Sequence, residues 1–204
     1  MQAARGTPVA QPGTSRRLLV LFAAVALVAY AADQVSKVVA TRTLDGRPDV
    51  QVVGELLQLH LTFNPGAAFS TGTGITPVIT VIAILATLGV LWYVRRVGSA
   101  LWAVALGVLL AGVAGNLTDR LLREPGPFRG HVVDFLMLPN WPVFNIADVC
   151  INVAAVLIIV QAFRGVRIDG TREGQPDDEA DADGEAAGTD DPADRPAPAE
   201  ERAE

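Results

Sequence analysis

The stretch ITPVITVIAILATLGVLWYV, residues 75–94, decides the fold of this chain. It has 20 consecutive positions without a charged side chain. A bilayer core of roughly 30 Å requires about 20 apolar residues from a helix that crosses it. This segment is therefore predicted to span a membrane.

Three more segments are similarly apolar but each contains one or two charged residues, at residues 18–40, 101–121 and 145–163. The spacing predicts an all-α membrane protein, a four-transmembrane-helix bundle, formed by residues 16–168. Residues 1–15 and 169–204 are expected to be disordered. The second of these carries 14 acidic residues and 3 arginines, and its lack of large apolar residues leaves little to bury.

Arginine pairs flank the predicted spans and indicate their orientation. These pairs are Arg16 and Arg17, Arg95 and Arg96, and Arg164 and Arg167. Basic flanks mark the cytoplasmic side, so both termini are expected in the cytoplasm and the links 41–74 and 122–144 outside. A rival interpretation takes Arg16, the apolar run and Ala29-Tyr30-Ala31 as a cleavable signal peptide.

The first outer link contains a strand pattern. Leu57, Leu59, Leu61 and Phe63 alternate with polar residues before the turn signal Asn64-Pro65-Gly66. A small extracytoplasmic β-sheet on the membrane face is expected. His60 is predicted to face solvent from this strand, and His131 is likewise assigned no catalytic role.

Polar residues gather at one depth in three spans. Asp33, Asn116 and Asp148 each lie 15 residues from the predicted cytoplasmic end of their span, which is roughly 22 Å along a helix. Each belongs to a stripe on one helix face. The stripes are Asp33 with Lys37; Asn116 with Asp119 and Arg120; and Asn145 with Asp148 and Asn152.

Ionisable groups at membrane depth are costly and usually mark function. The alternative is a purely structural role, in which these groups pair only to hold the bundle together. An ion pair between Asp33 and Lys37 would fit that role. Asp119 and Arg120 are open to the same interpretation.

A second carboxylate, Asp134, lies within the apolar run Val132–Leu138. The turn sequence Pro139-Asn140-Trp141-Pro142 follows and is expected to bring Asp134 close to Asp148. Two close carboxylates in a desolvated site share a proton, and such a pair hydrolyses amides by general acid–base catalysis. Candidate donors to the substrate carbonyl or the oxyanion are Asn64, Asn116 and Arg120.

Five segments match an ordered family pattern. They are DQVSK at 33–37, NPGAAFS at 64–70, GNLTDR at 115–120, VVDF at 132–135 and FNIAD at 144–148. Across residues 18–163 the chain resembles the lipoprotein signal peptidases, also called signal peptidase II.

The resemblance implies a bacterial plasma-membrane aspartic endopeptidase. It would cleave prolipoprotein signal peptides just before a diacylglyceryl-cysteine, with membrane lipids as further partners, no nucleic acid and no metal or organic cofactor. The implied catalytic pair is Asp134 and Asp148. The implied binding or supporting residues are Asp33, Lys37, Asn64, Gly66, Asn116, Asp119, Arg120 and Asn145.

The chain departs from this pattern at two places. The segment between the two aspartates is short, and Val149-Cys150 stands where small residues are usual. Three other classes stay open: a small transporter with a carboxylate proton relay, a Ser–Lys peptidase using Ser36 or Ser70 with Lys37, and a non-catalytic membrane scaffold.

Overall fold

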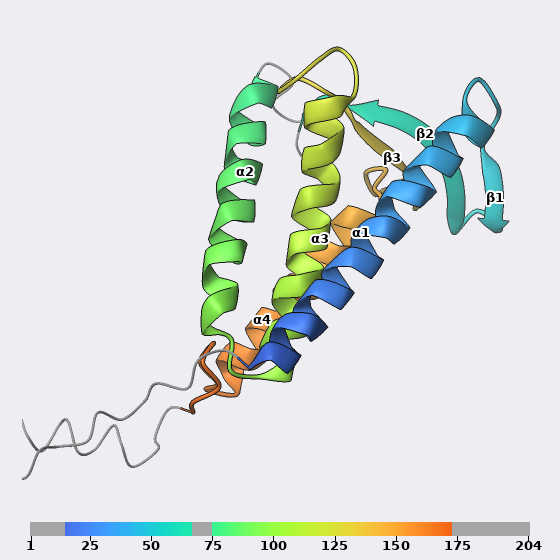
Figure 1. Ribbon diagram of the computed structural model, residues 1–204. Coiled ribbons are helices and arrows are strands. Elements are labelled where there is room, and N and C mark those ends of the chain that lie inside the picture. Colours follow the sequence, from blue (N-terminus) through green and yellow to red (C-terminus); the bar gives the residue numbers. More distant parts are fainter. Residues whose placement is uncertain (1–14, 67–74, 173–204) are drawn as a thin grey trace, which may run out of the picture.

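The computed structural model describes residues 15–66 and 75–172 and is shown in Figure 1. Within these ranges lie four long helices, each long and apolar enough to cross a membrane. They are α1 (Arg16–Leu44), α2 (Thr76–Tyr93), α3 (Ala100–Leu122) and α4 (Ile146–Phe163), with a short 3₁₀ turn η3 (Val94–Arg96) after α2. The predicted four-helix membrane fold is confirmed.

The predicted disordered ends lie mostly outside the described residues. Only 169–172 of the tail are described, and they form a turn after α4. This turn packs on the link between α2 and α3, where the Gly98 main-chain N–H donates to the Ile168 carbonyl at 2.9 Å. The positions 67–70 of the NPGAAFS segment also fall outside the described ranges.

Local sequence sets the helix boundaries. The hydroxyls of Ser15 and Ser99 accept hydrogen bonds from the first turns of α1 and α3, at 3.3 Å each, and Asn145 caps α4. Such N-caps satisfy main-chain N–H groups that have no partner within the helix. At 29 residues, α1 extends for roughly 44 Å, so its C-terminal end reaches the sheet in Figure 1.

Helix α3 lies at the centre of the bundle. Half of its apolar membrane-crossing stretch is buried inside the protein, whereas only 17–22% of the corresponding stretch is buried in each of the other three helices. Its glycines permit this close packing: a Cβ on Gly112 would lie 2.6 Å from the Ala147 carbonyl oxygen, and one on Gly115 would lie 2.5 Å from the Asp33 carboxylate. Small residues at helix crossings are typical of membrane bundles.

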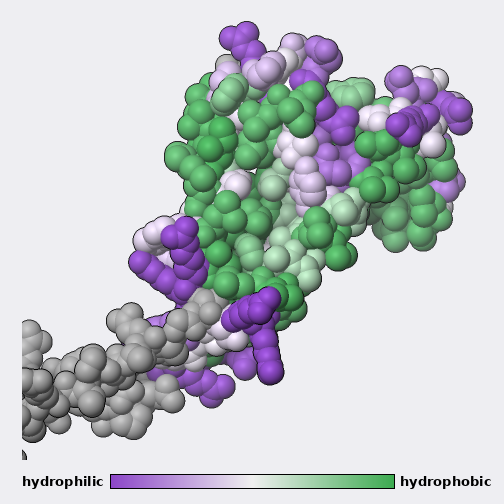
Figure 2. All heavy atoms as spheres, in the orientation of Figure 1, coloured by the Kyte–Doolittle hydropathy of each residue, from purple (hydrophilic) through white to green (hydrophobic). Residues whose placement is uncertain are grey.

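The bundle buries ionic residues beside an apolar core, and its outer surface is apolar. Asp33, Lys37 and Asp119 are completely buried, whereas Leu27 and Val28 are 68% and 70% exposed. Figure 2 shows the apolar surface along the helices, with hydrophilic residues towards the ends of the molecule. A helical surface of this kind is suited to lipid.

Three strands form an antiparallel sheet in the order β1-β2-β3. They are β1 (Val50–Val53), β2 (Leu57–Asn64) and β3 (Val132–Met137). The predicted sheet and its strand at 57–63 are confirmed, whereas β1 and β3 were not identified from the sequence.

The strict alternation expected for β2 is wrong. Leu59 pairs with Leu136 but Thr62 pairs with Asp134, so an extra residue lies between them on β2. Paired residues share a face of an antiparallel sheet, and a bulge shifts which residues face that side. Phe63 is consequently 49% exposed, and Asn64 lies on the Asp134 face.

Candidate active site

Asp134 and Asp148 come together through a tight fold-back of the chain. Asp134 is the third residue of β3, and Asp148 is the third residue of α4. Between them, Leu136 and Phe144 exchange main-chain hydrogen bonds of 2.8 and 2.9 Å. The predicted turn is present, with Asn140 in the left-handed region at φ 57°.

Two amide side chains connect the carboxylates. Asn145 Nδ2 donates to Asp134 Oδ1 at 2.6 Å and to Asn116 Oδ1 at 3.1 Å. Asn116 Nδ2 in turn donates to Asp148 Oδ1 at 2.9 Å. The two acids therefore belong to one hydrogen-bonded chain that fixes their relative positions.

The other carboxylate oxygens are also held. Asp134 Oδ2 accepts from Asn64 Nδ2 at 3.0 Å, a contact that the bulge in β2 makes geometrically accessible. Asp148 Oδ2 accepts from the Asn145 main-chain N–H at 3.1 Å, while the Asn145 side chain accepts from the Asp148 N–H at 3.0 Å. This reciprocal capping box begins α4 and orients Asp148.

Both aspartates line one cavity of about 500 Å³. That volume is within the range of small-ligand sites. The cavity is bounded by the ends of β2 and α3, by β3, by the turn containing Trp141, and by α4. Its polar lining residues are Asn64, Asn116, Arg120, Asp134, Asp148 and Asn152.

Burial, together with the nearby charge of Asp148, raises the pKa of Asp134 to about 6. The amide donors Asn64 and Asn145 oppose this shift because they favour the ionised carboxylate. Asp134 therefore keeps a proton to a higher pH than an ordinary aspartate.

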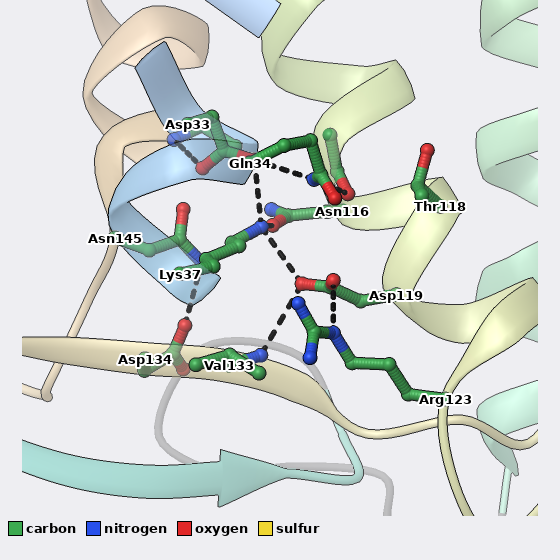
Figure 3. Close-up of polar contacts among 12 residues, drawn as sticks. Asp33, Gln34, Lys37, Asn116, Thr118, Asp119, Arg123, Val133, Asp134 and Asn145 are labelled. Atoms are coloured by element: carbon green, nitrogen blue, oxygen red, sulfur yellow. Dashed lines mark hydrogen bonds and ion pairs between the residues drawn. The ribbon is translucent and has the colours of Figure 1, made fainter. Parts of the chain in front are cut away.

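Lys37, Asp33 and Asp119 form a completely buried ion network, whose contacts are drawn in Figure 3. The Lys37 ammonium lies 2.9 Å from Asp33 Oδ2 and 2.8 Å from Asp119 Oδ2. It also donates to Asn116 Oδ1 at 3.0 Å. Because this contact holds the oxygen end of the Asn116 amide, the nitrogen end is left to face Asp148.

Arg120 has a buried donor nitrogen without a partner. Its Nη2 donates to the Gly66 carbonyl. Its Nη1 has no hydrogen-bond partner and is the one such buried side-chain nitrogen or oxygen among the described residues. An unpaired buried donor costs about 1–3 kcal/mol, so a ligand acceptor in the cavity would relieve that cost.

The ten predicted site residues fall into two groups. Those lining the cavity are Asn64, Gly66, Asn116, Arg120, Asp134 and Asp148. Asp33, Lys37, Asp119 and Asn145 are buried behind it. The ion pair between Asp33 and Lys37 is present, and Lys37 also orients the cavity residue Asn116.

The histidines and Ser36 lie away from the cavity. His60 faces solvent as expected, with 42% side-chain exposure, and its Nδ1 is 2.7 Å from Asp49 Oδ1. His131 is half-buried and does not line the cavity. The Ser36 hydroxyl donates to the Asp33 carbonyl at 2.8 Å, which offers no support to a Ser–Lys site; Ser70 lies outside the described residues.

The sequence did not reveal several supporting contacts. Gln34 donates to Asp33 and to the Gly115 carbonyl, and Arg123 donates to Asp119. The main-chain N–H groups of Ala147 and Val133 donate to Asp33 and Asp119, at 2.8 and 3.3 Å. Arg123 lies four residues after Asp119, and this helical spacing could have predicted their contact. No sequence pattern predicts the two main-chain donors.

Fold and site together define a class: a multi-pass helical membrane protein with a buried, carboxylate-lined cavity at one end of its bundle. Residues 25–164 match the family model of signal peptidase (SPase) II. The chain belongs to the signal peptidase II family and is therefore a peptidase.

Curated relatives are similar in sequence to this chain over most of its length. A lipoprotein signal peptidase of Leifsonia xyli subsp. xyli is 42% identical over 175 residues, which cover 83% of this chain and 81% of that protein. One of Rhodococcus jostii is 44% identical over 170 residues, covering 83% and 85%.

Solved structures show the same fold. A bacterial membrane enzyme determined by the in meso method at 2.3 Å has a TM-score of 0.66 and 24% identity, covering 77% of this chain and 96% of that one. A second, at 1.9 Å, has a TM-score of 0.63 and 26% identity, covering 72% and 94%.

Proposed function

We propose that this protein is an intramembrane aspartic endopeptidase that removes signal peptides from diacylglyceryl-modified prolipoproteins. Cleavage would occur just before the lipidated cysteine. The observation that carries the proposal is that Asp134 and Asp148 line one cavity and are joined through Asn116 and Asn145. The family membership supports a prolipoprotein as substrate.

The chemistry needs one proton shared by two acids. Asp134 is assigned the proton, because its pKa is raised by burial and by Asp148. Ionised Asp148 deprotonates a water while Asp134 donates to the carbonyl oxygen of the scissile peptide. Proton return to the leaving amine completes hydrolysis without an acyl-enzyme.

Arg120 is the candidate donor for a substrate oxygen. Asn64 and Asn116 were equal candidates from the sequence, and in the structure each donates one side-chain N–H to a carboxylate. Arg120 Nη1 has no such partner. A preorganised charged donor in a partly desolvated site stabilises developing negative charge more strongly than it would in water.

The cavity suits a substrate embedded in lipid. It reaches along α4 to Val149 and Val153, which are 40% and 44% exposed on the helix surface. A signal peptide and acyl chains lying in the bilayer would reach this apolar side laterally. The carboxylates lie near the sheet end of the bundle, where a site can still admit water.

The flanking arginines support a bacterial plasma-membrane orientation with both termini in the cytoplasm. The sheet and the cavity would then lie near the extracytoplasmic face. Residues 16–168 would form the catalytic membrane unit.

Asp134→Asn and Asp148→Asn test the proposal. Each should abolish cleavage of a diacylglyceryl-modified prolipoprotein by purified protein, because a neutral amide cannot exchange the shared proton. The unlipidated substrate should be cut poorly by the wild type. Asp49→Asn makes the same chemical change on the exposed outer loop and should retain activity.

Folding must be checked beside activity, by thermal unfolding in detergent. Ordinary turnover by both folded site variants would exclude the aspartate pair. A dead but folded Ser36→Ala variant would instead revive a serine mechanism.

A further inference from the structure

The deep end of the cavity carries a polar side chain that the proposed hydrolysis does not use. Asn152 lies one helical turn beyond Asp148 on α4 and lines the cavity with Val149 and Val153. One turn is roughly 5.4 Å. Since α4 begins at the sheet end of the bundle (Figure 1), Asn152 lies deeper in the bilayer than the aspartates.

The Asn152 side-chain amide uses only part of its hydrogen-bonding capacity. Its Nδ2 donates to the Asp148 main-chain oxygen at 2.9 Å. A carbonyl oxygen can only accept, so the nitrogen end of the amide must face this helical turn. Among the residues that the structure describes, the second N–H and Oδ1 make no further hydrogen bond. The Asn152 side chain is exposed, so these groups are open to a ligand in the cavity, and an amide facing lipid gains from such a partner.

The unused N–H and oxygen of the Asn152 side chain match one kind of ligand group. A donor N–H beside an acceptor oxygen matches a hydroxyl group, which can both donate and accept. Val149 and Val153 flank the amide on the same helix face and supply apolar contact. A small side chain with a hydroxyl and a methyl group, such as threonine, would use all three residues.

We propose that Asn152, Val149 and Val153 form a subsite for a hydroxyl-bearing side chain of the signal peptide. The position recognised would precede the scissile bond, because the signal helix continues from that bond into the bilayer, where Asn152 lies. The subsite rests on the proposed function, and it makes serine or threonine at one position a determinant of substrate choice.

A cycle of matched substitutions tests the subsite. Diacylglyceryl-modified substrates would carry threonine or its isostere valine at each of the three positions before the scissile bond. At one position, wild-type protein should cut the threonine form about three- to tenfold faster in kcat/KM, as one hydrogen bond allows. In Asn152→Leu, that threonine-to-valine ratio should fall to about one.

Val156→Leu is the matched control, since Val156 is exposed one helical turn beyond Asn152 and does not line the cavity. It should keep the wild-type ratio. Asn152→Ala provides the same comparison if the leucine variant does not fold.

A wild-type ratio near one at all three positions would overturn the subsite, as would a ratio that survives in Asn152→Leu or Asn152→Ala. Loss of all cleavage in both folded variants would also overturn it, because Asn152 would then serve the chemistry. These results are separate from the proposed function, which fails only if wild-type protein cuts none of the substrates or if Asp134→Asn cuts them.

Discussion

At the scale of single residues, the site depends on amides that hold carboxylates. Asn116 shows the principle: its oxygen accepts from Lys37 and Asn145, so its nitrogen must face Asp148. Lys37 is completely buried between Asp33 and Asp119. Removing one partner of such a buried pair typically costs about 3–5 kcal/mol. The ion network therefore supports both folding and the orientation of the cavity residues.

The pH dependence of cleavage should report the protonation of Asp134. If the singly protonated pair is the active form, kcat/KM falls as pH rises through the pKa of Asp134 in the free enzyme, about 6. Asn64 donates to the ionised carboxylate and lowers that pKa. Asn64→Leu should therefore raise the pKa and move the alkaline limb of the profile to higher pH.

The control for this shift is Thr62→Val, which changes the strand neighbour that pairs with Asp134. It should leave the limb in place. A limb that moves to lower pH in Asn64→Leu, or moves equally in both variants, would contradict the assignment of the proton to Asp134.

At the scale of elements, three pieces meet at the cavity. The bulge in β2 turns Asn64 towards β3, the fold-back after β3 delivers Asn145, and the capping box of α4 fixes Asp148. Helix α3 holds these pieces against α1 because its glycines allow close approach. The site is thus assembled from element ends, supported by one central helix.

Gly115→Ala tests the role of close packing. The added Cβ would lie 2.5 Å from the Asp33 carboxylate, and displacing that group disturbs the Lys37 network. Stability should fall by about 1–3 kcal/mol, the usual cost of overpacking, and cleavage should fall with it. Thermal unfolding and activity assays in detergent would measure both effects.

Gly89→Ala is the comparison, because a Cβ there meets nothing within 4 Å. It should be neutral or stabilising by up to about 1 kcal/mol, since alanine is the better helix former. Equal effects of the two substitutions would show that packing against Asp33 is unimportant.

At the scale of the whole molecule, charge and polarity are divided by region. The interior of the bundle holds buried ions and its flanks are apolar, as Figure 2 shows from one side. Arginines gather where α1 begins, α2 ends and α4 ends, opposite the sheet in Figure 1. This division makes the orientation of the chain in the membrane a testable property.

Single cysteines in a Cys150→Ala background would reveal the orientation. Glu55→Cys, on the sheet side, should react with a membrane-impermeant maleimide in intact cells. Arg95→Cys, in the link after α2, should react only after the membrane is permeabilised. The reverse pattern would place the sheet and the cavity in the cytoplasm.

The sequence by itself determined the four spans, because about 20 predominantly apolar residues have few structural outcomes other than a membrane helix. It also predicted a common depth for Asp33, Asn116 and Asp148, because helical rise is constant. Its ordered motifs identified the family that the comparisons confirm.

Only the tertiary structure decided how these residues divide into cavity lining and support. The bulge that turns Asn64 to Asp134 depends on pairing with β3, a strand about 70 residues away. The main-chain donors to Asp33 and Asp119, and the unpaired Arg120 Nη1, follow from the packing of separate elements. Local sequence encodes periodicity and caps, whereas which donors meet which acceptors is set by contacts between distant segments.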